Sequence, residues 1–440
     1  MRPLGPLLLL PLLALLLTAC PHTPPPPNPA ECPVGPLAAP QALEPLRLQG
    51  MGRFEGEYVP GEVLAIPAPG LSLQALKAQV AGVEPLEELP RGLVRLRVPV
   101  GQEKVKAQAL LKAGMRYVQP NYVYKPLRMP NDTYYYLNQR MYLNNLVGLE
   151  TAWDYSTGRG CPPLVAVLDT GVLEHEDFQK SKHLPAGVRL DVADNDADPT
   201  DRTSRIGPEA PFGHGLMVAT VLGADTNNAR GIAGVTWGGY VLPIKIMKDG
   251  GTSFFTSDIV DGLYLARGLG ARVVNLSLGA PGFSDGAVAS AISDLREAGA
   301  VIVAAAGNQA GPVFFPANLP GVVAVGAVDS AKRRASFSAY GPELDLVAPG
   351  VNVYAANPYN PRGYVGATGT SFASPIVAGV VALYMSKYAS ERKEWPTPDQ
   401  VYTCLTGTAE DLGADGRDDY HGFGLVRADR VMTDATYCFP

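Results

Sequence analysis

The chain has 440 residues, a net charge of −6 and 46% hydrophobic residues. This hydrophobic content is enough for a sizeable core and excludes wholesale disorder, and the length allows up to about three domains. The mild acidity argues against a nucleic-acid binder, because such proteins normally carry a basic patch. The 48 glycines and 41 prolines exceed the average share of these residues, which predicts many turns and some linker.

The beginning of the chain is typical of an export signal. An apolar run covers residues 7–17. A helix that spans a bilayer needs about 20 such residues, so this run predicts a signal peptide over 1–19 rather than a membrane anchor. The sequence Leu-Thr-Ala-Cys at 17–20 resembles a bacterial lipobox, in which the Cys is lipidated and starts the mature protein. Two or more acyl chains on Cys20 would hold the protein on a membrane. The alternative is an ordinary signal peptide, with Cys20 incidental.

A proline-rich stretch, HTPPPPNPA, follows this signal. Such a stretch is semi-extended and packs no core, so we expect a tether over 20–50. The composition then changes twice, which predicts a small domain over 51–126 and a large domain over 127–440. Export permits disulfides, and Cys404 with Cys438 is one plausible pair among the remaining cysteines.

The small domain has the pattern of a ferredoxin-like split βαβ unit, with the order strand, helix, strand, strand, helix, strand. Ser72 is a candidate cap of the first helix. This fold alone indicates no function. The segments that carry the pattern are Glu62–Ile66, Leu73–Val80, Leu93–Val100, Gln102–Ala113 and Met115–Tyr124.

The large domain alternates apolar runs with helical segments, which predicts an α/β fold whose parallel sheet is covered by helices on both faces. Sites in such sheets form beyond the carboxyl ends of the strands. The expected strands are Leu164–Leu168, Val241–Ile246, Val273–Leu278, Val301–Ala305, Val322–Val325 and Leu344–Val347. The expected helices are Ser257–Arg267, Asp285–Ala298 and Ser371–Tyr388.

Three polar residues at strand ends and helix starts are candidates for catalysis. Asp169 ends the run LVAVLD, His214 lies between two glycines, and Ser371 precedes a helix rich in small residues. A serine hydroxyl needs an adjacent base, and histidine, with an unperturbed pKa of about 6.5, is suited to that role. An aspartate would orient the imidazole. Taken singly, these residues could be a turn former, a hydrogen-bonded core histidine and a helix cap.

The helix after Ser371 favours negative charge at its start, because its first N–H groups are free and its dipole is positive there. Pro375 is expected in the first turn, where its missing N–H is harmless. The chain has five histidines. His22 lies in the proline-rich spacer, His175 and His183 are expected in a surface loop, and His421 lies in a Gly-rich tail, which leaves His214 as the candidate base.

The blocks LDTGV at 168–172, GHG at 213–215 and GTSFASP at 369–375 resemble the three signature blocks of the subtilisin-like serine peptidases. The order Asp, His, Ser is the order of that family. The resemblance covers roughly 127–435. It extends to the small domain, since RYVQPNY resembles the end of a subtilase inhibitor propeptide. The resemblance therefore implies a subtilisin-like α/β catalytic domain preceded by an inhibitory α+β propeptide domain.

The same resemblance implies further site residues. Asn308, in AAAGN, would supply the oxyanion hole together with the Ser371 N–H. The segment NLSLG would pair with the substrate backbone, and the side chain before the cut would enter an open, apolar-tolerant pocket. The residues implied for substrate binding are Ser277, Leu278, Gly279, Ala305 and Gly307.

Three residues depart from the family pattern, and the smallest change is Gln309, which follows GN where an acidic residue is common. The family usually has Thr and His after HG, whereas this chain has Leu216 and Met217. Apolar bulk therefore replaces a polar layer beneath His214, which leaves the orientation and pKa of that residue open.

The resemblance also implies structural Ca²⁺. One site would use the side chains of Asp132, Asp177 and Asn228 with the carbonyl groups of Thr226, Arg230 and Ile232. A second would lie in the loop DVADNDADP, because carboxylates at such density repel unless a hard cation neutralises them. The alternative for this loop is a solvated acidic segment. Its carboxylates belong to Asp191, Asp194, Asp196 and Asp198.

The sequence thus predicts a serine endopeptidase that is exported or anchored at the bacterial cell envelope. It would act on protein or peptide substrates, and its own propeptide would inhibit it until cleavage near Lys125–Pro130. A lipase is disfavoured, since its nucleophile sits in G-x-S-x-G and Ser371 does not. A catalytically inactive surface binding protein is the remaining alternative, and no nucleic acid is expected as a partner.

Overall fold

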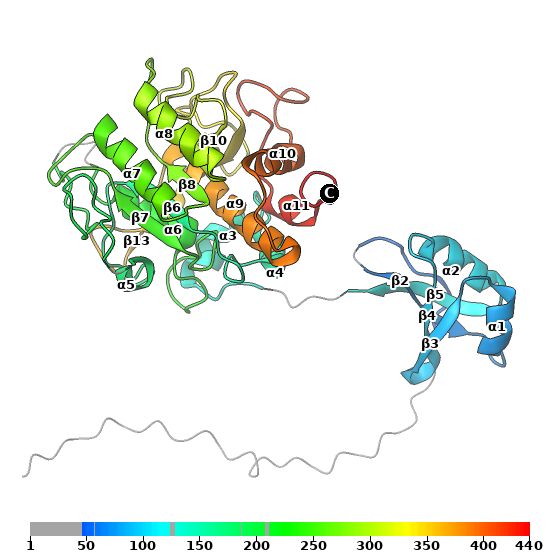
Figure 1. Cartoon of the computed structure of the whole chain (residues 1–440). Helices are drawn as coiled ribbons and strands as arrows, with labels where there is room; N and C mark the ends of the chain where they lie inside the picture. Colours follow the sequence, from blue (N-terminus) through cyan, green and yellow to red (C-terminus); the bar gives the residue numbers. More distant parts are fainter. Residues whose placement is uncertain (1–45, 57, 124–127, 186, 207–210) are drawn as a thin grey trace, which may run out of the picture. The chain divides into compact units, whose positions relative to one another are not determined.

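The computed structural model describes residues 46–56, 58–123, 128–185, 187–206 and 211–440. These residues form two compact units, one ending at Val123 and one starting at Arg128 (Figure 1). Each unit has its own hydrophobic core. The expected signal peptide, Cys20 and most of the expected tether lie outside the described residues, as does part of the expected cleavage region.

The small unit is a five-stranded sheet with the strand order β1-β5-β2-β4-β3. The order of elements from β2 to β5 is the predicted one, and these four strands pair antiparallel with one another, whereas β1 pairs parallel with β5. Ser72 lies at the N-cap position of α1, but its side chain makes no capping hydrogen bond. The elements are β1 (Gly50–Met51), β2 (Tyr58–Pro67), α1 (Leu73–Gln79), β3 (Glu84–Leu89), β4 (Leu93–Arg97), α2 (Glu103–Lys112) and β5 (Met115–Tyr122).

The large unit is built on a six-stranded parallel sheet with the strand order β11-β10-β9-β8-β6-β7. Its strands are largely apolar because both faces are covered, as expected for a parallel sheet. The polar exceptions are Asp169, Lys245 and Asn275. All residues of β6 and β9, for example, are buried. The strands are β6 (Val165–Asp169), β7 (Val241–Lys245), β8 (Val273–Leu276), β9 (Val301–Ala305), β10 (Val322–Val328) and β11 (Leu346–Pro349).

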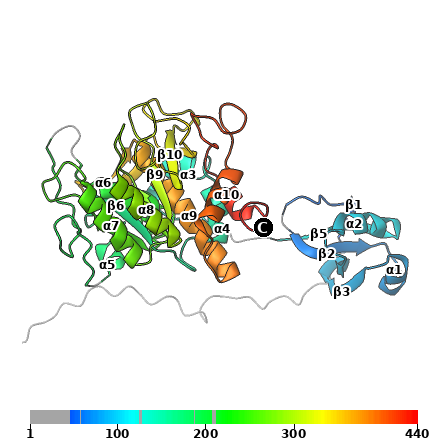
Figure 2. The same cartoon turned by 45° about the horizontal axis from the view of Figure 1, so that its top comes forward.

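Helices pack on this sheet in two pairs. Helices α7 (Thr256–Gly268) and α8 (Gly286–Glu297) pack against each other, and α6 (His214–Gly223) packs against α9 (Thr370–Arg392) (Figure 2). Helix α9 is long and apolar enough to cross a membrane by length and composition, but most of it is buried in the core. The predicted α/β fold, with a parallel sheet flanked by helices, is therefore confirmed.

Shorter elements complete the large unit. A hairpin, β12 (Val353–Ala356) with β13 (Tyr364–Ala367), forms a separate antiparallel pair. The disulfide between Cys404 and Cys438 is present, as suggested. The remaining helices are the π-helical segment Tyr135–Gln139, α3 (Arg140–Leu143), α4 (Leu149–Tyr155), α5 (Lys180–His183), α10 (Pro398–Thr408) and α11 (Ala428–Thr433).

The expectation of a surface loop for His175 and His183 is wrong, since both side chains are buried. His175 Nε2 bonds the Gly363 carbonyl oxygen at 2.9 Å. The His183 ring stacks on Phe178 at a centroid distance of 4.1 Å. Both imidazoles are thus used for packing.

Candidate active site

Three segments far apart in sequence meet at the carboxyl edge of the large sheet. Asp169 is the last residue of β6, His214 is the first residue of α6, and Ser371 is the second residue of α9. Nδ1 of His214 lies 2.8 Å from Oδ1 of Asp169. The same carboxylate oxygen accepts the N–H of Thr170 at 2.7 Å, which fixes its orientation.

The two glycines beside His214 are required for different structural reasons. Gly213 has a φ of 82°, a left-handed conformation that few other residues adopt at low cost. A Cβ on Gly215 would collide with the Gly171 carbonyl oxygen. Helix α6 therefore starts in van der Waals contact with the end of β6, and this close approach brings the imidazole to the carboxylate.

The charges around His214 favour its protonated form. Burial lowers the pKa of the imidazole, but the charge of Asp169, its hydrogen bond to Nδ1 and the charge of Asp201 outweigh burial and raise the pKa above its usual value. Oδ2 of Asp169 is buried and accepts no hydrogen bond from the described residues. Its charge is therefore poorly screened, which strengthens its attraction to an imidazolium.

Leu216 and Met217, which follow the GHG motif, do not disturb the bond between His214 and Asp169. Leu216 is fully buried in the core, and Met217 packs partly buried against it. The carbonyl groups of both residues accept the hydroxyl of Thr220. The apolar substitution is thus absorbed by the core beneath α6, and the bond between His214 and Asp169 is formed.

Ser371 is anchored by neighbours on β8 and the segment after it. Its hydroxyl donates to the Ser277 carbonyl oxygen at 3.3 Å, and none of the described residues, His214 included, offers it another hydrogen bond. In return, Ser277 Oγ donates to the Ser371 carbonyl oxygen at 2.8 Å. Asn275 holds this arrangement, since its side chain donates to Ser277 Oγ and accepts from Ser374 Oγ.

Pro375 has a different role from the one expected. It is the sixth residue of α9 and so lies beyond the first turn. Its missing N–H deprives the Ser371 carbonyl of its usual helical donor, four residues ahead. The hydroxyl of Ser277 supplies that donor instead. The proline therefore opens the helix to a contact that ties the serine to β8.

Thr370 orients the side chain of Asn308 so that the amide NH₂ group of Asn308 is available as a donor. Its Oδ1 accepts both the N–H and the hydroxyl of Thr370, each at 2.9 Å. Because an N–H must meet the amide oxygen, Nδ2 is directed away from Thr370. Nδ2 makes no hydrogen bond to a described residue, and the side chain is exposed. The amide thus offers a donor beside Ser371.

A cavity of about 390 Å³ adjoins Ser371 and Asn308. All five residues expected to bind substrate line it: Ser277, Leu278, Gly279, Ala305 and Gly307. Two aromatic residues that the sequence did not indicate, Phe254 and Phe314, line it as well. A Cβ on Gly307 would lie 2.6 Å from the Phe314 ring, so the glycine is required by this wall.

The first predicted metal site contains two buried carboxylates near each other. Asp132 is 3% exposed and Asp177 is fully buried. Burial, and the charge of Asp177, raise the pKa of Asp132 to about 6, although two backbone N–H groups oppose the shift. Burial also raises the pKa of Asp177. Neither carboxylate has an ion-pair partner among the described residues, although Oδ2 of Asp177 accepts the Tyr364 hydroxyl at 2.8 Å. Two buried carboxylates without an ion pair have the oxygen ligands that a hard cation takes.

The other predicted ligands of this site lie on the loop beside it. Backbone N–H groups of Asn227 and Asn228 donate to Asp132, and the Ile232 N–H donates to Asp177. The Asn228 side chain is turned differently from the expectation. Its Nδ2 donates to Asp177, while its Oδ1 accepts the N–H of Arg230. The carbonyl oxygen of Thr226, the predicted ligand atom, accepts Arg159 Nη2 at 3.4 Å.

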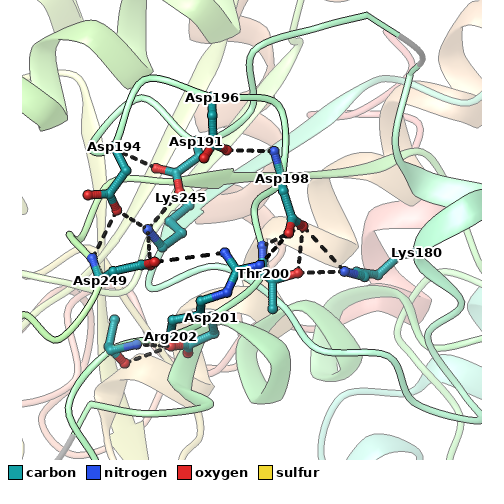
Figure 3. A network of polar contacts seen from close by, with 11 residues as sticks. Lys180, Asp191, Asp194, Asp196, Asp198, Thr200, Asp201, Arg202, Lys245 and Asp249 are labelled. Atoms are coloured by element: carbon teal, nitrogen blue, oxygen red, sulfur yellow. Dashed lines mark hydrogen bonds and ion pairs between the residues drawn. The ribbon is translucent and has the colours of Figure 1, made fainter.

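The second predicted metal site contains a lysine. Lys245 is fully buried, and its ammonium group bonds Asp191 at 2.7 Å, Asp194 at 2.5 Å and Asp249 at 3.0 Å (Figure 3). The crowded carboxylates thus already have a cation from β7. This part of the loop therefore does not fit calcium, since the ammonium group stands where the ion would be.

The rest of the acidic loop is also paired within the protein. Asp198 bonds Lys180, Thr200 and Arg202 (Figure 3). Asp196 accepts the Asp198 N–H. The expectation that these carboxylates need an added ion to offset their repulsion has no support in their contacts.

Comparison with known proteins identifies the family of this chain. Residues 160–424 match the model of the subtilase family. A thermophilic serine proteinase from Bacillus sp. strain AK1 is 36% identical over 361 residues, which cover 80% of this chain and 85% of that protein. Subtilisin Savinase from Lederbergia lenta is 36% identical over 274 residues, 62% of this chain and 91% of its own.

A solved structure agrees as well. A protease from Pseudoalteromonas arctica aligns with 70% of this chain and all of its own, with a TM-score of 0.61 and 31% identity. The chain therefore belongs to the subtilase family and is a subtilisin-like serine endopeptidase.

Proposed function

We propose that Ser371 is the nucleophile of this endopeptidase, that His214 is its general base, and that Asp169 orients the base. The observation that carries the proposal is the 2.8 Å bond between Asp169 and His214 at the sheet edge where Ser371 starts α9. That bond fixes the tautomer, because Nδ1 must hold the proton that Asp169 accepts. Nε2 is then the basic atom of the ring.

The first step requires Ser371 to change its hydrogen-bond partner. Its hydroxyl would leave the Ser277 carbonyl and turn towards His214 Nε2. Side-chain rotations of this kind are fast, and catalytic hydrogen bonds are often long before substrate binds. Ser371 Oγ then attacks the peptide carbonyl carbon while Nε2 takes its proton, and the same proton later passes to the leaving amine.

The tetrahedral intermediate places a negative charge on the former carbonyl oxygen. Nδ2 of Asn308 and the backbone N–H of Ser371 would donate to it. The Ser371 N–H lies in the first turn of α9, where helical N–H groups have no intrahelical partner. The anchoring of Asn308 by Thr370 holds this donor in place before the charge forms.

The substrate would bind as an extended peptide along Ser277–Gly279, by main-chain hydrogen bonds. The side chain before the cut would enter the cavity lined by Ala305, Gly307 and Phe314. The aromatic wall favours apolar side chains there. This selects a broad class of protein and peptide substrates rather than one residue type.

The precursor would mature by cutting itself. The small unit would act as folding aid and intramolecular inhibitor, and cleavage between it and the large unit, near Lys125–Pro130, would free the cleft. The support is the element order of the small unit and its separate core. Ser371→Ala is expected to leave the precursor uncut in an otherwise folded protein.

Export is supported by the signal-like segment and by relatives named as extracellular, such as the extracellular protease of Xanthomonas campestris pv. campestris. Lipidation of Cys20 would retain the enzyme on a membrane. Digestion of a membrane fraction with a lipoprotein lipase would release the enzyme if an acyl anchor holds it, and a Cys20→Ser variant should be soluble from the start.

Calcium, when bound, would be held by Asp132 and Asp177 and would neutralise their two buried charges. The ion would stabilise the loop that contains Asn228 and Ile232 against the N-terminal part of the large unit. It would take no part in the chemistry at Ser371.

Casein digestion by the wild type and by Ser371→Ala tests this function. Loss of the serine should reduce hydrolysis by about 10⁶-fold, as the triad acts as a unit. Wild-type protein that is folded and cleaves no protein or peptide would instead support the alternative of an inactive surface binding protein.

A further inference from the structure

A second carboxylate, that of Asp201, lies beside the proposed triad. It is 1% exposed, although no lysine or arginine in the described part of the chain forms an ion pair with it. Four donors face its two oxygens. Oδ2 accepts Thr170 Oγ1 at 2.6 Å and Gly213 N at 2.7 Å, and Oδ1 accepts Thr203 N at 2.9 Å and Thr203 Oγ1 at 2.6 Å.

The partners of Asp201 are the chain neighbours of the two triad residues. Thr170 follows Asp169, and its N–H holds the Asp169 carboxylate at 2.7 Å. Gly213 precedes His214 at the start of α6. Thr170 Oγ1 also accepts the N–H of Gly215 at 2.9 Å. One carboxylate thus connects the end of β6 to the first turn of α6.

The position of Asp201 is itself determined by backbone bonds. Its N–H donates to the Val172 carbonyl at 3.0 Å, and the Val172 N–H donates to the Pro199 carbonyl at 2.8 Å. These bonds extend β6 beyond Asp169 and pair it with the segment around Thr200. In the sequence, this segment comes directly after the acidic loop whose Asp191 and Asp198 form ion pairs with Lys245 and Lys180 (Figure 3).

We propose that Asp201 is a positioning residue of this enzyme, which holds Asp169 and His214 in register through Thr170 and Gly213. It touches no substrate and acts only through these neighbours. The inference rests on the proposed roles of Asp169 and His214. A carboxylate is required, because all four contacts are donors; an asparagine would offer one acceptor oxygen and would turn an NH₂ group towards two of them.

The charge of Asp201 adds a second effect. Two carboxylates, Asp169 from β6 and Asp201 from the loop after it, raise the pKa of His214, while α9 contributes the apolar ring of Phe372, at a centroid distance of 5.7 Å. Loss of the Asp201 charge therefore moves the protonation of His214 to lower pH. A residue with a purely structural role would leave this protonation where it is.

The test compares Asp201→Asn with the wild type in kcat/KM for a peptide substrate across pH, and counts active sites with a fluorophosphonate. We expect kcat/KM at neutral pH to fall about tenfold, which corresponds to ~1.4 kcal/mol, and the acid limb to move to lower pH. The matched control is Asp345→Asn. That half-buried carboxylate also accepts one backbone N–H and one hydroxyl, from Ala324 and Tyr402, but precedes β11 at the amino edge of the sheet. It should keep the wild-type rate and acid limb.

A second pair of variants keeps the test decisive if Asp201→Asn does not fold. Thr170→Val removes the hydroxyl that links Asp201 to Gly215, whereas Thr170→Ser keeps it. We expect a roughly tenfold loss of kcat/KM in the first and a near-wild-type rate in the second.

Three outcomes separate the possible failures. A folded Asp201→Asn variant with the rate and acid limb of the wild type overturns the inference, as does a Thr170→Val variant equal to Thr170→Ser. A wild type that the fluorophosphonate does not label at Ser371 overturns the proposed function instead.

Discussion

The hydroxyl oxygen of Ser371 lies 3.3 Å from the Ser277 carbonyl oxygen, to which it donates, and makes no hydrogen bond to the His214 ring. The bond is at the long end for a hydroxyl donor, so little energy opposes rotation of the side chain. The opposite bond, from Ser277 Oγ to the Ser371 carbonyl, is short at 2.8 Å and holds the backbone. The serine backbone is therefore fixed while its hydroxyl is free to turn.

The first prediction concerns pH. Because the pKa of His214 is raised above its ordinary value of 6.5, the base is protonated and inactive below that pKa. We expect kcat/KM to fall with decreasing pH, with a midpoint above pH 6.5. Initial rates on a chromogenic peptide from pH 4 to 10 give this midpoint. A rate that stays flat down to about pH 4 would exclude His214 as the base.

The second prediction concerns the oxyanion donor. Asn308→Asp keeps the two acceptor contacts with Thr370 but replaces the Nδ2 donor by an oxygen. We expect kcat to fall by roughly 10²–10³-fold, the range measured for such a donor in a subtilisin, with little change in KM. Steady-state kinetics on one peptide substrate measure kcat and KM of the variant and of the wild type. Equal losses in binding and in turnover would point to a general disturbance of the cavity.

The third prediction concerns calcium. A chelator should lower the melting temperature of the protein, because a ligand at a hundred times its Kd stabilises by ~2.7 kcal/mol. The melting temperature of an Asp177→Asn variant should no longer respond to the chelator. Asp194→Asn is the contrasting variant, since Lys245 already neutralises that carboxylate, and it should keep the wild-type response. A response lost in Asp194→Asn but kept in Asp177→Asn would place the ion in the acidic loop.

The fourth prediction concerns the lysine of that loop. Lys245→Met leaves the fully buried partner carboxylate of Asp191 without its cation, which should cost about 3–5 kcal/mol of unfolding free energy. Lys180→Met removes a lysine from the more exposed Asp198 and should cost no more than about 1 kcal/mol. Urea unfolding of the two variants, each as Ser371→Ala to prevent self-digestion, measures both values. Equal costs would mean that Lys245 does not neutralise the loop.

Sequence patterns predict the sheet well because buried parallel strands are continuous apolar runs. The run Val301–Ala305 is β9 without any shift of its bounds. The roles of the glycines beside His214 and of the residues around Ser371 can also be predicted from the sequence, because short-range backbone geometry requires these residues. Asp169, His214 and Ser371 therefore come together at the predicted sheet edge.

Contacts between segments that are distant in sequence cannot be predicted in the same way. Lys245 lies in an apolar run, and nothing local shows that it meets Asp191, 54 residues earlier. Asp201 resembles any other acidic residue of its loop until its partners are known. Phe314 lines the cavity only because its ring packs on Gly307. Pro375 acquires its role from Ser277, which is distant in sequence.

Fluorophosphonate labelling followed by peptide mapping tests most directly whether Ser371, His214 and Asp169 form one catalytic unit. We expect Ser371 to be the single modified residue, with peptidase activity lost in proportion to labelling. A folded His214→Ala variant should not be labelled. Full peptidase activity in protein whose Ser371 is unmodified after complete reaction of another serine would contradict this expectation.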